Sequence, residues 1–491
     1  MHNITLVDVV FSSVTRRLVL TCFVFSFAVY IFPSTTHAFE KENTLTQQLK
    51  TIKQQTGVGA VTYALVENDR IIATGGIGQY SSDNKREVTE DSLFRVGSIT
   101  KSFTALAVMK LVEQDKLQLD QAIKKLAPDL PLQNPWPQTP VTLAMLLEHT
   151  AGLQDLTQEE FDYPLPLSLK KSFTIQPQTK KLHWPPGYHY SYSNIGAGYL
   201  GRAIEIITQE NYDDWFEREV LAAMGMHDSQ LRWTKKLQQN LITGYDADLK
   251  KEIPYWHTLY RPFGGLNTTA RDMATFLLLF TNQSTEAKKI ISATSISRME
   301  SAETSLAAKV GLETTYGLGL RARYLDGRKI YGHAGDADGY LAEFAYSKES
   351  RRGYFVMINA FRHDLLARFT ERLDNWLIED LANNAKDSLP PVVKSLSHQN
   401  IKALVGDYHE VTKRFPSNHK SSTKLHIKNI DNDMFRCFTN TNTNKDRCTK
   451  IVPVTESLFR TEHQSHASIA FITASDKNIY LQTGFSNYKK E

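Results

Sequence analysis

The sequence has little cysteine, no block of charge of one sign and no metal-ligand motif. Only three of its 491 residues are cysteine, and 57 basic residues stand against 53 acidic ones, for a net charge of +4. A balance this even argues against a nucleic-acid partner. Neither His-Glu-x-x-His nor a paired Cys-x-x-Cys occurs, so we expect no metal and no cofactor.

The first 38 residues have the layout of an export signal. Arg16 and Arg17 precede an apolar run over residues 18–32, and Pro33 and a small-residue site ending at Ala38 follow it. This run of 15 residues is shorter than the roughly 20 that span a bilayer, so cleavage after Ala38 is favoured over an uncleaved anchor. We therefore expect a periplasmic or secreted protein with no stable membrane span. The choice between Sec and twin-arginine export stays open.

Removal of the signal leaves two cysteines, Cys437 and Cys448. In an oxidising compartment they favour a disulfide that closes a short loop. Two free thiols are the alternative.

The mature chain, about 450 residues long, is too long for one compact core, so we expect two domains. Strand patterns lie near both ends of residues 39–386, with helical patterns between them. This order indicates one antiparallel sheet built from both ends, with an inserted helical region. The expected strands cover 59–66, 71–76, 329–333, 340–346 and 353–359. A linker over 387–395 then leads to short alternating runs, which predict a small all-β domain, a barrel or a sandwich, over 396–491.

Ser98-Ile99-Thr100-Lys101 is the best candidate for a nucleophile and its base. If Ser98 lies in the first turn of a helix, the i,i+3 spacing brings its hydroxyl within reach of the Lys101 amine. A serine needs such a base, and the helix N-terminus favours the negative charge that develops nearby. Ser98 follows a glycine and opens a long apolar helical run. Five other Ser-x-x-Lys tetrads, at Ser82, Ser168, Ser417, Ser421 and Ser486, lie in polar, turn-like sequence and indicate solvated side chains.

Tyr192-Ser193-Asn194 is the only Tyr-x-Asn of the chain and is expected on a loop that enters a helix. A phenol beside a lysine ammonium is partly ionised, so Tyr192 can carry a proton from Ser98 to a leaving group. Asn194 offers a donor and an acceptor that suit an amide-like substrate. Simple aromatic packing of Tyr192 is the alternative.

His333-Ala334-Gly335 is the only His-x-Gly and is expected at the end of a strand. Gly335 allows a substrate to approach the strand edge closely. The backbone N–H groups of Asp336 and Ser98 would together form an oxyanion hole. A hydrogen-bonded structural histidine is the alternative for His333.

In this order, the three motifs resemble those of the serine β-lactamase and penicillin-recognising hydrolase family, nearest to its class C branch. Residues 147–153 and 263–273 also resemble recurring segments of that family, so the resemblance covers about residues 45–385. It implies an α/β sandwich, with an antiparallel sheet flanked by helices and an inserted helical region, and an active site between the two parts.

The resemblance also implies a mechanism. Ser98 attacks a carbonyl while Lys101 and Tyr192 transfer its proton. The backbone N–H groups of Ser98 and Asp336 hold the oxyanion, and water then releases the acyl group. Asn194, His333 and Gly335 would orient the substrate.

One departure bears on the substrate. Classical β-lactamases and many D,D-peptidases of this family have Lys-Thr-Gly or Lys-Ser-Gly where this chain has His333-Ala334-Gly335. A mostly neutral histidine weakens the binding of a substrate carboxylate, and Asp336 and Asp338 add negative charge. We therefore expect hydrolysis of an ester or amide, of esterase or D-peptidase type, in a small-molecule or peptide substrate, with cell-wall peptides among the candidates. A true class C-like β-lactamase and a catalytically idle binding or scaffolding module of the same fold are the alternatives.

Overall fold

The structure is a computed structural model that describes residues 33–161, 163, 165–281, 290–381, 396–412, 414, 423–440 and 445–491. The expected linker over 387–395 and most of the expected signal lie outside these residues. Helix α1 (Pro33–Thr56) runs through the expected cleavage point after Ala38, and the cleavage stays a prediction. Among the described helices, none combines the length and the apolar character that a membrane crossing requires. Residues 46–491 form one compact unit.

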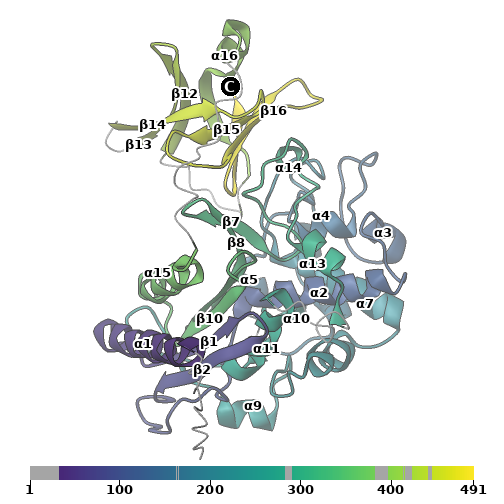
Figure 1. The fold of residues 1–491 in the computed structure, drawn as a ribbon. Helices are drawn as coiled ribbons and strands as arrows, with labels where there is room; N and C mark the ends of the chain where they lie inside the picture. The colour runs from purple at the N-terminus through teal and green to yellow at the C-terminus, as the bar shows by residue number, and fades with distance from the viewer. Residues whose placement is uncertain are drawn as a thin grey trace, which may run out of the picture. The chain divides into compact units, whose positions relative to one another are not determined.

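A six-stranded antiparallel sheet is the centre of the larger part of this unit (Figure 1). Its strands, in spatial order, are β2 (Arg70–Gly78), β1 (Ala60–Glu67), β10 (Arg352–Ile358), β9 (Tyr340–Ser347), β8 (Arg328–Ala337) and β7 (Arg321–Leu325). Strand β1 pairs with β10, with Val61 opposite Ile358, which confirms that both ends of the segment build one sheet. Strand β8 continues to Ala337, so the expectation that the strand ends at His333 was wrong. Its pairing with β9 extends as far as Ala337 opposite Tyr340.

Helices cover the two faces of this sheet (Figure 1). Helix α11 (Ala270–Thr281) packs on β1, β2 and β10, and helix α15 (His363–Ile378) packs on β9 and β10. In α15, Leu366, Phe369, Leu373 and Trp376 recur at helical spacing and are buried, as an amphipathic helix on a sheet requires. Because both faces are covered, β1 and β10 are buried along nearly their whole length.

The expected helical insertion lies between β2 and β7. Its longest helices are α2 (Thr100–Glu113) and α7 (Asn194–Thr208). Helix α2 is buried on nearly all of its sides, in agreement with its long apolar sequence. The short helices are α3 (Ile123–Leu126), α4 (Leu143–Leu147), α5 (Gln158–Phe161), α6 (Leu169–Ser172), α8 (Tyr212–Phe216), α9 (Lys235–Asn240), α10 (Arg261–Gly264), α13 (Ala293–Met299) and α14 (Leu306–Lys309). Single turns cover Gly97–Ile99 (η1), Pro177–Thr179 (η2), Glu217–Leu221 (η3) and Ala222–Met224 (η4). Two small strand pairs join β3 (Phe94–Arg95) to β6 (Asn267–Thr268) and β4 (Gly244–Tyr245) to β5 (Glu252–Ile253).

The C-terminal part is a closed eight-stranded barrel, so the barrel rather than the sandwich is correct. Helix α16 (His398–Leu404) precedes it. The strands are β11 (Gly406–Glu410), β12 (Thr423–Ile430), β13 (Asp433–Asn440), β14 (Lys445–Pro453), β15 (Leu458–Thr461), β16 (Ile469–Thr473), β17 (Ile479–Thr483) and β18 (Ser486–Lys490). Alternate residues such as Leu425 and Ile427 fill the interior. A disulfide joins Cys437 to Cys448, which lie opposite each other on β13 and β14.

Candidate active site

The turn η1 carries Ser98 directly into helix α2. Gly97 has a φ of +50°, which glycine adopts without strain. A Cβ at this position would lie 2.3 Å from the carbonyl oxygen of Asp336, so only glycine lets the turn lie this close to β8. The residue before Ser98 is therefore set by two requirements, the left-handed backbone and the contact with the sheet.

Lys101 lies on the first turn of α2 with its amine beside the serine. Its Nζ is 3.0 Å from Ser98 Oγ and donates to the carbonyl oxygen of Phe263 at 2.9 Å. The side chain is buried, and this burial lowers the pKa of Lys101 well below its ordinary 10.5. A lowered pKa favours the uncharged amine, which is the form that can accept the proton of the serine hydroxyl.

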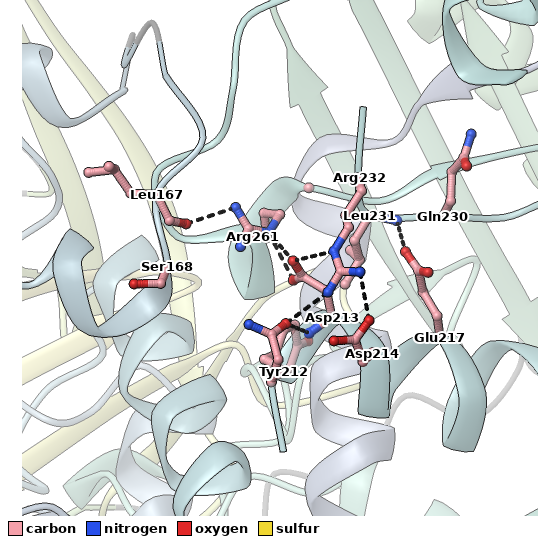
Figure 2. Close-up of polar contacts among 12 residues, drawn as sticks. Leu167, Ser168, Tyr212, Asp213, Asp214, Glu217, Gln230, Leu231, Arg232 and Arg261 are labelled. Carbon is pink, nitrogen blue, oxygen red and sulfur yellow. Dashed lines mark hydrogen bonds and ion pairs between the residues drawn. The ribbon is translucent and has the colours of Figure 1, made fainter. Parts of the chain in front are cut away.

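An ion-pair cluster around Asp213 holds Arg261, two residues before Phe263, whose carbonyl oxygen accepts from Lys101; Figure 2 shows the contacts of Asp213 with Arg232 and Arg261. Phe263 belongs to the short helix α10, whose first residue is Arg261. Arg261 Nε donates to both carboxylate oxygens of the buried Asp213 at 2.8 Å, and Arg232 contacts the same carboxylate. This cluster fixes the start of α10 and with it the place of the Lys101 amine.

Tyr192 lies just before helix α7, on the loop that the sequence predicts. The Lys101 Nζ is 4.9 Å from the centre of its ring. Burial raises the pKa of Tyr192 to about 12, although Arg321, Arg414 and the nearby Ser98 act against this rise. Its hydroxyl is buried and has no hydrogen bond of normal geometry to a described residue. Burial thus favours a neutral amine beside a neutral phenol and acts against the expected pair of ammonium and phenolate, which stays a prediction.

Asn194 opens helix α7 and is held by the buried carboxylate of Asp155. The backbone N of Asn194 donates to Asp155 Oδ1 at 2.8 Å, and its Nδ2 donates to Oδ2 at 3.1 Å. Its own Oδ1 is buried and accepts no hydrogen bond from a described residue. An amide fixed in this way presents a free acceptor to a substrate N–H group.

Strand β8 brings Gly335 and Asp336 against the turn that carries Ser98. A Cβ on Gly335 would lie 1.8 Å from the carbonyl oxygen of Val96. The close approach that this glycine permits is thus between the strand and the turn that carries Ser98. The backbone of Asp336 lies against Gly97, which brings together the two segments whose N–H groups are the predicted oxyanion donors.

His333 is buried on β8 and turned toward Tyr316. Its Nε2 lies 2.7 Å from the Tyr316 hydroxyl. Burial lowers the pKa of His333 well below 6.5, and Arg321 and Lys101 reinforce the shift. His149 lies close by, with its ring 4.5 Å from that of Tyr316 and 4.2 Å from that of Tyr192. Neutral His333 therefore supports the wall of the site and brings no fixed charge to it.

These elements enclose a cavity of about 600 Å³. It is lined by Ser98, Phe161, Tyr192, Asn194, Trp256, Phe263, Arg321, Ala334, Asp336, Ala337, Asp338, Phe361, His363 and Arg414. The structure thus brings Ser98, Tyr192, Asn194 and Asp336 to one space, with Lys101 directly beneath Ser98 and His333 outside the lining. A volume of this size suits a small molecule or the end of a peptide.

The motifs did not indicate three charged residues of this site: Asp155, Arg321 and Arg414. Asp155 follows closely on the segment over 147–153, so extending that segment by two residues would have reached it. Arg321 and Arg414 stand in no motif. Tertiary contacts alone bring them to the cavity.

Comparison with known proteins shows the family of this chain. The chain matches the Beta-lactamase family over residues 44–374, and it belongs to that family of serine hydrolases. Protein flp of Staphylococcus aureus is 20% identical over 343 residues, which cover 68% of this chain and 66% of the relative. The chain thus spans just under two thirds of the length of that relative.

Two solved structures show the same fold. The octameric penicillin-binding protein homologue from Pyrococcus abyssi matches 91% of this chain and 99% of its own, at 22% identity and a TM-score of 0.59. The β-lactamase/D-alanine carboxypeptidase from Yersinia pestis, complexed with citrate, matches 69% of this chain and 99% of its own, at 19% identity and a TM-score of 0.57. The first similarity extends over most of the chain, whereas the second covers about two thirds of it.

Proposed function

We propose that this protein is an exported serine hydrolase that forms an acyl-enzyme on Ser98 and hydrolyses an ester or amide. The observation that carries the proposal is the 3.0 Å separation between Ser98 Oγ and the Nζ of a buried Lys101, at the lining of a cavity. Membership of a family of serine hydrolases supports it. The name of one solved neighbour, a β-lactamase/D-alanine carboxypeptidase, supports D-peptides as candidate substrates.

The proposed reaction begins with attack of Ser98 Oγ on the carbonyl carbon of the substrate. The Lys101 amine takes the hydroxyl proton as the new C–O bond forms. The N–H groups of Ser98 and Asp336 stabilise the oxyanion, a contribution of roughly 3–4 kcal/mol for one such donor. Tyr192 then protonates the leaving oxygen or nitrogen as its bond to carbon breaks, and Lys101 replaces the proton on Tyr192.

Hydrolysis of the acyl-enzyme repeats these steps with water as nucleophile. Water loses a proton to the base, its oxygen bonds to the acyl carbon, and Ser98 Oγ leaves with a proton. The unpaired Oδ1 of Asn194 is placed to accept a hydrogen bond from a substrate amide. We also propose the export signal over 1–38 and the domain limits 39–386 and 396–491, which N-terminal sequencing of the mature protein and limited proteolysis would test.

The test of the nucleophile is covalent labelling. A fluorophosphonate or a fluorescent penicillin should label the wild-type protein at the peptide that contains Ser98, and Ser98→Ala should abolish the labelling. Ser82→Ala is the matched control, because Ser82 belongs to another Ser-x-x-Lys tetrad and lies outside the cavity lining. Equal labelling of Ser98→Ala would refute the assignment.

A substrate screen then separates the activities. Short p-nitrophenyl esters, D-amino-acid peptides and nitrocefin report esterase, D-peptidase and β-lactamase activity, with Ser98→Ala as the blank. We expect turnover of esters or D-peptides to exceed that of nitrocefin, because the neutral His333 stands where β-lactamases carry a lysine.

A further inference from the structure

The segment that follows the first barrel strand reaches the rim of the cavity. The Val411 carbonyl oxygen accepts a hydrogen bond from Trp184 Nε1 at 2.6 Å, and the Arg414 carbonyl oxygen accepts one from the Asp155 N at 2.8 Å. Asn487, on the last barrel strand, donates to the Tyr190 carbonyl oxygen at 2.7 Å. These contacts bring the segment after the first barrel strand, and the last barrel strand, to the region of the loop that carries Tyr192.

The Arg414 side chain enters the cavity from this segment. Its Nε donates to Asp155 Oδ2 at 2.8 Å, and its Cζ lies 4.6 Å from the centre of the Tyr192 ring. Asp155 is fully buried and also holds Asn194. Arg414 is thus held by the same carboxylate that holds Asn194, at the end of the loop that carries Tyr192.

Two arginine side chains and the Lys101 amine gather around the Tyr192 ring. The Lys101 Nζ lies 4.9 Å and the Arg321 Cζ lies 5.9 Å from its centre. Arg414 and Lys101 are therefore within about 10 Å of each other, a distance at which charges still interact through a protein. Arginine stays protonated at every working pH, so any proton gained by Lys101 adds to existing positive charge.

We propose that Arg414 is a positioning residue of the catalytic site, an inference that rests on the proposed function. The fixed positive charge of Arg414, which comes from the barrel segment, keeps the Lys101 amine unprotonated and ready to accept the Ser98 proton. The barrel is then a working part of the hydrolase. Removal of this one side chain should alter proton transfer even for a substrate that carries no charge.

The charges around Lys101 agree with this role. Burial is the largest cause of the lowered pKa of Lys101, and Arg414 and Arg321 lower it further. Asp155 and Asp336 act in the opposite direction. The other titratable groups near Tyr192 carry no charge at neutral pH: burial lowers the pKa of His149 and His333 and raises the pKa of Tyr190 and Tyr316. The two arginines are therefore the cations that offset these carboxylates.

The test uses the full-length protein and a neutral p-nitrophenyl ester, which offers Arg414 no carboxylate to bind. In Arg414→Gln, the acid limb of kcat/KM should move up by about one pH unit, so that activity falls about tenfold on that limb and is recovered at higher pH. Arg414→Lys keeps the charge and should follow the wild type. Arg447→Gln, at an exposed arginine on β14, is the matched control and should not move the profile.

Two results would overturn the proposal. An unchanged profile for the neutral ester would mean that Arg414 serves only to bind an anionic substrate. An equal loss at every pH, shared by Arg414→Lys, would mean that the residue only supports the structure.

A second readout separates this proposal from the proposed function. Acetylation of Lys101 by acetic anhydride, followed by mass spectrometry across pH, reports the pKa of the amine without turnover. Arg414→Gln should raise it by about one unit. If this shift occurs while a fluorophosphonate fails to label Ser98, the proposed function is wrong and the role of Arg414 toward Lys101 stands. If Ser98 is labelled and the shift is absent, the role of Arg414 is wrong.

Discussion

Replacement of Gly335 by alanine would place a methyl group between β8 and the turn that carries Ser98. Its Cβ would lie 1.8 Å from the Val96 carbonyl oxygen and 3.2 Å from Ile99 Cγ1. Because a carbon and a carbonyl oxygen approach to about 3.3 Å, the strand and the turn must separate by roughly 1.5 Å. The obstacle is backbone on a buried turn, so it cannot be relieved by rotation of a side chain.

This separation moves the two predicted oxyanion donors apart, because Ser98 lies on the turn and Asp336 on the strand. A misplacement of about 1 Å can cost about 10²-fold in rate, and the loss of one oxyanion donor about 10²–10³-fold. We therefore expect kcat of Gly335→Ala to fall by at least about 10²-fold. Overpacking should also lower the free energy of unfolding by about 1–3 kcal/mol.

Gly264→Ala is the matched control, because Gly264 approaches the same turn from α10. Its Cβ would lie 3.7 Å from the Gly97 carbonyl carbon, an ordinary contact. We expect this variant to stay within about threefold of the wild type. Steady-state ester hydrolysis gives kcat, urea unfolding gives stability, and circular dichroism checks the fold. A folded Gly335→Ala enzyme with kcat within threefold of the wild type would refute the reasoning.

Two further predictions concern stability. Replacement of both Cys437 and Cys448 by serine opens a covalent loop with a sequence separation of 11 and should cost about 3 kcal/mol of unfolding free energy, with Ser98 labelling unchanged; an unaltered urea midpoint would contradict this. Burial lowers the pKa of His189 to about 4. Below pH 6.5 the unfolded chain therefore binds a proton that the folded chain does not. The free energy of unfolding should fall by about 3 kcal/mol between pH 6.5 and 4. His189→Gln should flatten the profile of unfolding free energy against pH, and an identical slope in both proteins would show that His189 is not the cause.

Periodicity and turn residues predicted much of the fold, because they report local structure. The apolar run of β1 corresponds to a strand buried on both faces, and the helical spacing in α15 corresponds to one buried face. The closure of the C-terminal strands into a barrel was not predictable, since closure depends on the pairing of β11 with β18. The end of β8 was misplaced, since the strand continues through Gly335 to Ala337 and the missing side chain of Gly335 serves the contact with Val96.

The sequence by itself determined the local pairings of the candidate site. Ser98 and Lys101 lie one helical turn apart, Tyr192 and Asn194 stand at a helix entrance, and such short-range geometry follows from spacing alone. Only the tertiary structure decided the charge state and the surroundings of these groups. Burial lowers the pKa of the Lys101 amine and raises the pKa of the Tyr192 phenol, and Arg414 reaches them from more than 200 residues further along the chain. Desolvation and long-range charge depend on what packs against a side chain, which no local pattern records.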